Sequence, residues 1–256
     1  MQLSINGQKH WENDGVTPSM VNVVTEHSRK ENSLLEAKSH EIRTYMTRII
    51  SMTDLTLMTE VTEEQRDYLT TVKSSTKLLL KVLTDIMDYS KIQAGKVDLE
   101  QRPFDIRQIV DEVIDLFNTA AQQKNIEIRL KDFNNEIPKN VIGDSLRIKQ
   151  VLSNLVGNSV RFTNQGGVAI EVDLEELNER WMQIRFIVSD TGIGIPEDKL
   201  SKLIKGFREA DSLIKEFGGT GLIITKKLVR LMDGELYVDS REGIGSKFYF
   251  TAVFGV

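Results

Sequence analysis

The sequence predicts two domains: an all-α antiparallel helical hairpin that pairs with a second copy into a dimeric four-helix bundle, followed by an α+β sandwich. Residues 19–92 contain no proline and carry two long stretches of helical apolar periodicity. Beyond Gly95, short strand-like segments alternate with helical ones, which is typical of a sheet covered by helices. With 40% hydrophobic and 28% charged residues among 256, the chain can bury a sizeable core.

Composition excludes several classes of function. There is no cysteine, so disulfides, thiolate metal sites and cysteine nucleophiles are ruled out. The net charge of -5 and the lack of a long basic run argue against nucleic acid as a partner. No apolar run approaches the roughly 20 residues that cross a bilayer. We therefore expect no membrane span in this chain and a cytoplasmic location, alone or as the cytoplasmic part of a longer sensor.

Two helices form the predicted hairpin. The first, from about Ser19 to Met58, repeats apolar residues every 3.5 to 3.6 positions in its second half. Thr62, followed three residues later by Gln65, fits a capping box that starts a second helix ending near Gly95. Because two helices cannot enclose a core, a hairpin with this much apolar surface should dimerise.

The second domain is predicted element by element. Pro103 marks a linker and a first strand, and helical patterns follow at 106–124, 145–162 and 222–232. Strands are expected at 126–130, 167–176, 181–190, 234–240 and 245–254, the middle two pairing as a hairpin across "ELNER". Residues 191–220 are rich in glycine and are expected to be mainly loop. The helices should cover one face of the sheet.

One helical stripe carries polar side chains suited to a polyphosphate. Asn154, Asn158 and Arg161 stand at i, i+4 and i+7, so they project from one face of the helix. Amide oxygens suit Mg²⁺, while amide N–H groups and a guanidinium suit phosphate oxygens. A solvated helix face explains the same pattern, and the stripe alone does not decide between them.

Two glycine-containing strings follow. In "SDTGIGIP", Asp190 ends a strand and can accept from an exocyclic amine such as that of adenine, while Gly192 and Gly194 permit close approach of a ligand. An ordinary turn is the alternative. In "GGTGL", Gly218, Gly219 and Gly221 precede a helix, whose N-terminus attracts phosphate.

Taken together, these strings resemble the catalytic core of sensor histidine kinases over residues 30–254. "SHEIRT" resembles the phospho-acceptor box, "NLVGNSVRFT" the N box, and "SDTGIGIP" and "GGTGL" the two glycine boxes. "SREGIGSKFYF" resembles the end of the ATP-binding domain, and "DIMDYSKIQAGKVDLE" the end of the dimerising hairpin. The resemblance implies a HisKA-type domain followed by an ATP-binding domain of the GHKL, or Bergerat, fold. The boundaries expected are 1–30 for a signal-helix lead-in, 31–97 and 102–256.

The resemblance also implies roles on the hairpin. His40 would accept the γ-phosphoryl group of ATP, and Glu41 would act as general base and hold the other ring N–H. Thr44 would hold a water for dephosphorylating the partner. The partners implied are a second copy of the chain and the receiver domain of a response regulator, which accepts the phosphoryl group on an aspartate.

Further roles fall on the ATP-binding domain. Asn154 resembles the Mg²⁺ ligand, so ATP and Mg²⁺ are the expected cofactors. Phosphate contacts are implied for Asn158 and Arg161, the latter replacing a more usual lysine. Asp190, with Gly192 and Gly194, resembles the adenine-binding set. Gly219 and Gly221 match the glycines of the lid over the phosphates.

Four departures from the family pattern leave a second interpretation open. Tyr45 replaces the proline after "HExRT", and Thr47 replaces an asparagine. The F box reads "IKGF", with Gly206 in place of a proline, and Ile223 stands where the second glycine box has a further glycine. If that position needs positive φ, isoleucine is a poor substitute.

The resemblance therefore implies either an active kinase with a variant lid, or a degenerate kinase that would serve as a dimeric scaffold for the response regulator or as a phosphatase. A third class, ATPases related to chaperones and topoisomerases, shares the nucleotide fold. That class gives no role to the histidine-bearing hairpin.

Overall fold

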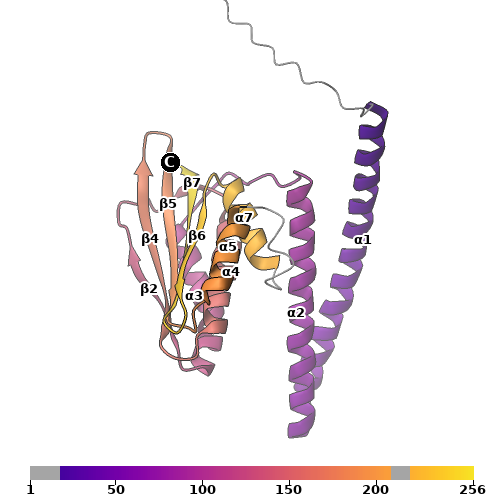
Figure 1. Ribbon diagram of the computed structural model, residues 1–256. Helices are drawn as coiled ribbons and strands as arrows, with labels where there is room; N and C mark the ends of the chain where they lie inside the picture. The colour runs from indigo at the N-terminus through magenta and orange to yellow at the C-terminus, as the bar shows by residue number, and fades with distance from the viewer. Residues whose placement is uncertain (1–17, 209–219) are drawn as a thin grey trace, which may run out of the picture. The chain divides into compact units, whose positions relative to one another are not determined.

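The computed structural model describes residues 18–208 and 220–256, with side chains from 38 to 205, except Gln93, and from 221 to 256 (Figure 1). It divides into two compact units, Met1–Ser90 and Lys91–Val256. In the part of the chain that is described, no helix is both long enough and apolar enough to cross a membrane. The predicted boundaries at 31–97 and 102–256 stay predictions.

The first unit is helical, as predicted. Helix α1 (Pro18–Leu57) continues without a break through Tyr45, and α2 (Glu63–Gln93) follows after a short turn. The capping box forms in both directions: the Thr62 N–H donates to Gln65 Oε1 at 3.0 Å, and the Gln65 N–H donates to Thr62 Oγ1 at 3.2 Å. This reciprocal pairing satisfies two backbone donors at the start of α2, which explains where the helix begins.

The hairpin keeps many apolar side chains in contact with solvent. On α2, Val72, Leu79 and Ile86 are 45%, 51% and 41% exposed and stand seven residues apart, so they form one stripe. On α1 the large exposed side chains include Ile42, Tyr45, Ile49, Met52 and Leu55. Contiguous apolar surface of this kind marks an interaction site.

The second unit is built on a mixed seven-stranded sheet. The strands are β1 (Arg102–Phe104), β2 (Glu127–Phe133), β3 (Val141–Gly143), β4 (Gly167–Leu177), β5 (Trp181–Asp190), β6 (Leu236–Arg241) and β7 (Gly245–Gly255). The order is β1-β3-β7-β5-β4-β2, with β6 also paired to β7. Only β2 and β4 run parallel, and the predicted hairpin of β4 and β5 is present.

Four described helices cover one face of this sheet (Figure 1). They are α3 (Ile106–Gln123), α4 (Ser145–Phe162), α5 (Glu197–Arg208) and α7 (Thr220–Leu231). Along β5 the side chains of Met182, Ile184 and Phe186 are fully buried towards the helices, and Phe186 stacks on Phe250 with ring centroids 4.8 Å apart. The predicted α+β sandwich with helices on one face is confirmed.

Two elements were missed by the sequence analysis. Helix α5 occupies part of the span 191–220 that was expected to be mainly loop, and the short strand β3 was not predicted at all. Helix α5 begins directly after Pro196 with two acidic residues, which favour a helix N-terminus. Its Leu203 is only 1% exposed, so the helix packs on the core. The glycines on both sides of α5 hid this signal.

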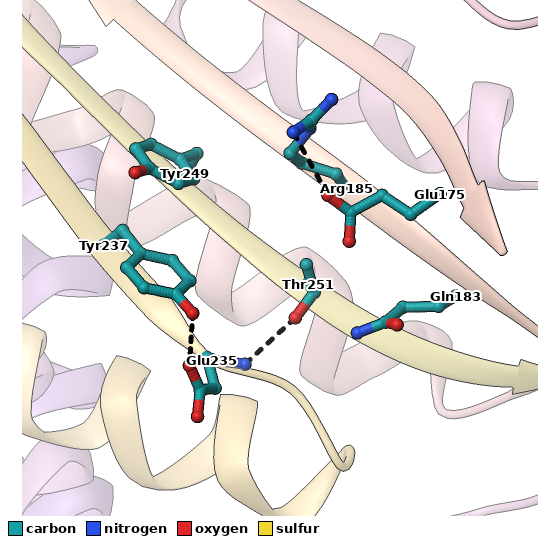
Figure 2. A pocket seen from close by; sticks show the side chains of 7 residues that line it. All are labelled: Glu175, Gln183, Arg185, Glu235, Tyr237, Tyr249 and Thr251. Atoms are coloured by element: carbon teal, nitrogen blue, oxygen red, sulfur yellow. Dashed lines mark hydrogen bonds and ion pairs between the residues drawn. The ribbon is translucent and has the colours of Figure 1, made fainter.

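The opposite face of the sheet is hollowed between β4, β5, β6 and β7 (Figure 2). This hollow of about 290 Å³ is lined by Glu175, Gln183, Arg185, Glu235, Tyr237, Tyr249 and Thr251. Arg185 pairs with Glu175 at 3.1 Å, and the Tyr237 hydroxyl donates to Glu235, which raises the pKa of Tyr237 to about 12. Because its residues alternate along β5 with those packed under α4, the hollow lies on the side away from the predicted nucleotide residues.

Candidate active site

The predicted nucleophile lies on the exposed side of α1. His40 and Glu41 are both exposed, which leaves the imidazole accessible to a donor. Lys38 Nζ donates to one oxygen of Glu41 at 3.0 Å, and the Tyr45 hydroxyl donates to the other at 3.2 Å. Lys38 first and Tyr45 second hold the pKa of Glu41 below its usual value, so this carboxyl stays charged.

Thr44 stands one helical turn after His40, as predicted. Its hydroxyl donates to the His40 carbonyl oxygen at 3.0 Å, a common arrangement for threonine inside a helix. In this bond the hydroxyl oxygen keeps its lone pairs, so it can still accept from a water. The three hairpin residues singled out by the sequence are therefore neighbours on one short stretch of α1.

The predicted phosphate-side residues lie on α4. This helix starts with an N-cap, because Asp144 Oδ1 accepts from the Arg147 N–H at 3.0 Å. One side of α4 is fully buried through residues such as Leu152 and Leu155. Asn154 and Asn158 are half-buried beside that apolar stripe, and Arg161 is exposed near the C-terminal end, its guanidinium 5.3 Å above the ring of Phe162.

Asp190, at the end of β5, is fixed from three directions. Its Oδ1 accepts from the N–H groups of Gly192 and Ser246, at 2.9 and 3.2 Å, and its Oδ2 accepts from the Ser159 hydroxyl at 3.1 Å. These partners belong to the following turn, to β7 and to α4. The carboxylate is thereby held rigid and partly buried, while Oδ2 has a further lone pair for a ligand amine.

The glycines after Asp190 are needed for close packing. Gly194 has φ of +66°, and a Cβ there would lie 2.1 Å from the carbonyl oxygen of Arg241. A Cβ on Gly192 would lie 2.6 Å from the Phe162 carbonyl oxygen and 2.9 Å from Asp190 Oδ1. Both glycines thus keep the turn pressed against the end of α4 and the β6–β7 connection.

The start of α7 meets α4 at Asn154. A Cβ on Gly221 would come within 2.5 Å of Asn154 Oδ1, so only glycine lets the start of α7 pack this closely against the Asn154 amide. An amide oxygen is a ligand that Mg²⁺ accepts, and Mg²⁺ is commonly bound by few protein groups together with substrate phosphates. The amide oxygen of Asn154 is therefore a donor whose chemistry fits a magnesium-bound nucleotide. Gly219, the other predicted lid glycine, and Gly218 before it lie outside the described residues.

The condition attached to Ile223, a positive φ, is not met in the structure. Its side chain is 1% exposed, within helix α7 and packed in the core, and it is absent from the described non-glycine residues with positive φ, which are Asn125 and Asp233. Isoleucine at this position therefore strains no backbone turn and occupies no phosphate-facing surface. In the F box, Ile204 is 37% exposed on α5, whereas the side chain of Phe207 lies outside the described ones.

Sequence reasoning missed several residues that hold the site together. Ser159 and Thr225 are 2% and 1% exposed, and each hydrogen-bonds a predicted site residue. Lys124 Nζ donates to three carbonyl oxygens at the end of α4, those of Val160, Arg161 and Thr163, at 2.8 to 3.1 Å. For Ser159 and Thr225, the sequence offered one local signal, a hydroxyl side chain at a position where the helical pattern predicts an apolar one.

A sheet covered on one face, with a fixed aspartate after a strand and amides on the facing helix, defines an ATP-binding domain joined to a histidine-bearing helical hairpin. Two family models match this division. Residues 30–95 match the His Kinase A (phospho-acceptor) domain, and residues 143–255 match the histidine kinase-, DNA gyrase B-, and HSP90-like ATPase family. The chain carries the two domains of a sensor histidine kinase catalytic core.

Curated relatives agree with that assignment. The signal transduction histidine-protein kinase BarA of Escherichia coli is 42% identical over 228 residues, which are 88% of this chain and 25% of the relative. The sensor histidine kinase GacS of Pseudomonas protegens is 39% identical over 229 residues, with the same two coverages of 88% and 25%. The chain thus spans about a quarter of the length of these relatives.

Among solved structures, full-length ShkA in complex with AMPPNP superposes with a TM-score of 0.67 at 30% identity. The match covers 88% of this chain and 46% of that one. The match therefore includes both the helical hairpin and the sandwich.

Proposed function

We propose that this chain is an ATP-dependent histidine autokinase that phosphorylates His40 and passes the phosphoryl group to an aspartate of a response regulator receiver domain. The observation that carries the proposal is the carboxylate of Asp190, fixed by three donors at the end of the central strand β5, in a chain that also exposes a histidine beside a carboxylate. Because this acceptor is already held in place without a ligand, binding an adenine amine would cost little ordering of the protein.

On the nucleotide side, each predicted residue has a separate task. Asp190 accepts from the adenine amine, while Gly192 and Gly194 shape the turn that the base lies against. Asn158 and Arg161 lie further along α4, where they neutralise and orient phosphate oxygens. Asn154 would hold Mg²⁺ through its amide oxygen. The metal supplies charge neutralisation of the phosphates, which together with positioning accounts for most of the catalysis of phosphoryl transfer.

On the hairpin side, a nitrogen of the His40 ring attacks the γ-phosphorus. The bond from phosphorus to the bridging oxygen breaks, and ADP leaves with the electron pair. Glu41 accepts a hydrogen bond from the other ring N–H and stabilises the positive charge that develops on the imidazole. Thr44 holds a water for the reverse task, hydrolysis of the phosphorylated partner.

A second copy of the chain is the proposed partner of the hairpin. The stripe of Val72, Leu79 and Ile86 on α2 and the exposed apolar residues of α1 have the spacing of helices that pack side by side. Two hairpins would bury these side chains in a four-helix bundle. His40 would remain on the outside of that bundle, accessible to the ATP-binding domain and to the receiver domain.

The test is incubation with ATP labelled at the γ-phosphate. We expect an acid-labile, base-stable label on the protein that His40→Gln abolishes, and transfer of that label to an aspartate of the cognate receiver. Glu41→Gln should keep nucleotide binding and lose most of the labelling. Labelling that persists in the His40→Gln protein contradicts the proposal.

The scaffold alternative makes a different prediction in the same assay. It predicts nucleotide binding by calorimetry with no label on His40 at any time. Ile223 is buried in α7 and has no positive φ, which supports the kinase over the scaffold. Ile223→Gly should therefore destabilise the fold and should not accelerate labelling.

A further inference from the structure

Asn154 is held by a residue that the sequence boxes do not include. Its Nδ2 donates to Thr225 Oγ1 at 2.7 Å, a side-chain bond that joins α4 to α7 across 71 positions of sequence. Thr225 is 1% exposed, whereas Asn154 is half-buried. Leaving a buried donor or acceptor without a partner costs free energy, so this hydrogen bond constrains the orientation of the amide strongly.

The chemistry of an amide makes this bond directional. One end of the group is an acceptor oxygen and the other is a donor NH₂, and only the oxygen can ligate a hard cation. With Nδ2 committed to the threonine hydroxyl, Oδ1 is fixed at the other end. That oxygen lies beside the bare Cα of Gly221, where a Cβ would approach it to 2.5 Å. The hydrogen bond to Thr225, on α7, therefore selects one orientation of the Asn154 amide.

We infer that Thr225 is a positioning residue for the magnesium-bound nucleotide, acting through the orientation of the Asn154 amide. The inference rests on the proposed function, because it takes Asn154 as the Mg²⁺ ligand. Groups that orient a metal ligand typically change metal affinity by 10- to 100-fold when they are removed. Thr225 touches neither metal nor nucleotide, so its effect should appear only where Mg²⁺ takes part in binding.

The experiment measures nucleotide affinity by calorimetry, using a non-hydrolysable ATP analogue with Mg²⁺ and again with chelator. Thr225→Val keeps the shape of the side chain and removes the acceptor oxygen. We expect its affinity with Mg²⁺ to fall by about 10-fold, while its affinity in chelator stays within about two-fold of the wild type. Thr225→Ser keeps the hydroxyl and should restore the magnesium-dependent gain.

Matched variants separate positioning from a loss of structure. Thr251→Val removes another buried hydroxyl of the same domain, one that accepts from the Glu235 N–H on the far side of the sheet. It should leave both affinities unchanged. If Thr225→Val unfolds, Thr225→Ala fits the same space without a methyl clash and replaces it in the same titration.

Each result has a clear consequence. Equal losses with and without Mg²⁺, or no loss at all, overturn the role of Thr225. If the wild type binds the ATP analogue equally tightly with Mg²⁺ and with chelator, the metal role of Asn154 is overturned, and this inference with it. The labelling of His40 is measured separately, with γ-labelled ATP on the same protein preparations, so failure of phosphoryl transfer with a preserved magnesium pattern would contradict the proposed function alone.

Discussion

The two units of this chain build their functional residues in opposite ways. On α1, the contacts of His40, Glu41 and Thr44 all lie within one helical turn, three or four residues apart, and all are exposed. In the ATP-binding domain, Asp190 is held by partners 31 and 56 positions away, and Asn154 by one 71 positions away. The hairpin residues are thus placed by helix geometry, whereas the nucleotide residues are placed by the packing of the whole domain.

The difference extends to apolar surface. The hairpin exposes apolar side chains along both helices, while Phe186, Phe250, Leu152 and Leu155 in the sandwich are fully buried. The sandwich thus has an apolar core of its own, and we expect the hairpin to bury its apolar stripe against a partner. Changes on the hairpin should act on assembly, and changes in the sandwich should act on affinity and stability.

The largest expected effect is on assembly. Leu79→Lys places a charge at the centre of the α2 stripe, once in each protomer. Since an unpaired charge inside an interface costs several kcal/mol, the Kd of the dimer should rise by roughly 1,000-fold. Analytical ultracentrifugation of a dilution series measures it. Leu116→Lys, at an equally exposed leucine of α3, is the control and should leave the dimer intact.

The next effect is on adenine recognition. In the wild type, the Gly192 N–H and the Ser159 hydroxyl donate to the carboxylate of Asp190. In Asp190→Asn, the amide NH₂ is itself a donor and must face one of these donors. We expect the nucleotide affinity to fall by about 100-fold by calorimetry. Asp173→Asn, on the far face of the sheet and 3.7 Å from Arg185, should change it by less than about two-fold. Similar losses in both would refute a specific role for Asp190.

A third prediction separates binding from stability at two glycines. Gly221→Ala should lower affinity for the magnesium-bound nucleotide by about 10-fold, because its Cβ displaces the Asn154 amide. The free energy of unfolding should fall only slightly, since the helix preference of alanine over glycine offsets part of the loss of the Asn154–Thr225 hydrogen bond. Gly192→Ala meets the backbone carbonyl of Phe162, which cannot move as easily, so it should lose stability as well. Denaturant titrations that rank the two variants the other way contradict this account.

A smaller effect is expected at the end of α4. Lys124→Met leaves three carbonyl oxygens without their ammonium donor, at the negative end of the helix dipole. The free energy of unfolding of the domain should fall by about 1 to 2 kcal/mol in urea titrations. Lys131→Met removes only an exposed pair with Glu171, and a loss as large as that of Lys124→Met would argue against the cap.

The smallest effect concerns pH. Lys38 and, to a lesser extent, Tyr45 hold the pKa of Glu41 below its usual value, so protonation of this base is delayed to lower pH. Tyr45→Phe should therefore move the acid limb of the labelling rate towards higher pH. Lys38→Met should move it further in the same direction. Rates measured across an acid series decide the matter, and a shift towards lower pH in either variant would contradict it.

Much of this protein could be predicted from its sequence because the relevant interactions are local. The capping box of Thr62 and Gln65, the bounds of α4 and the hairpin of β4 and β5 depend on periodicity and on neighbours a few residues away. The same holds for the cluster around His40. Strand β3 and helix α5 were missed, since one is very short and the other is flanked by glycines.

The sequence by itself determined most of the helices and strands, though not β3 or α5, and the residue types proposed to bind the nucleotide and accept the phosphoryl group. The tertiary structure alone decided which groups hold them: Ser159 on Asp190, Thr225 on Asn154 and Lys124 on the end of α4. It also decided that Ile223 belongs to the core. The physical reason is that a hydrogen bond between elements distant in sequence has no period or spacing, and it forms only when the sheet and its helices pack.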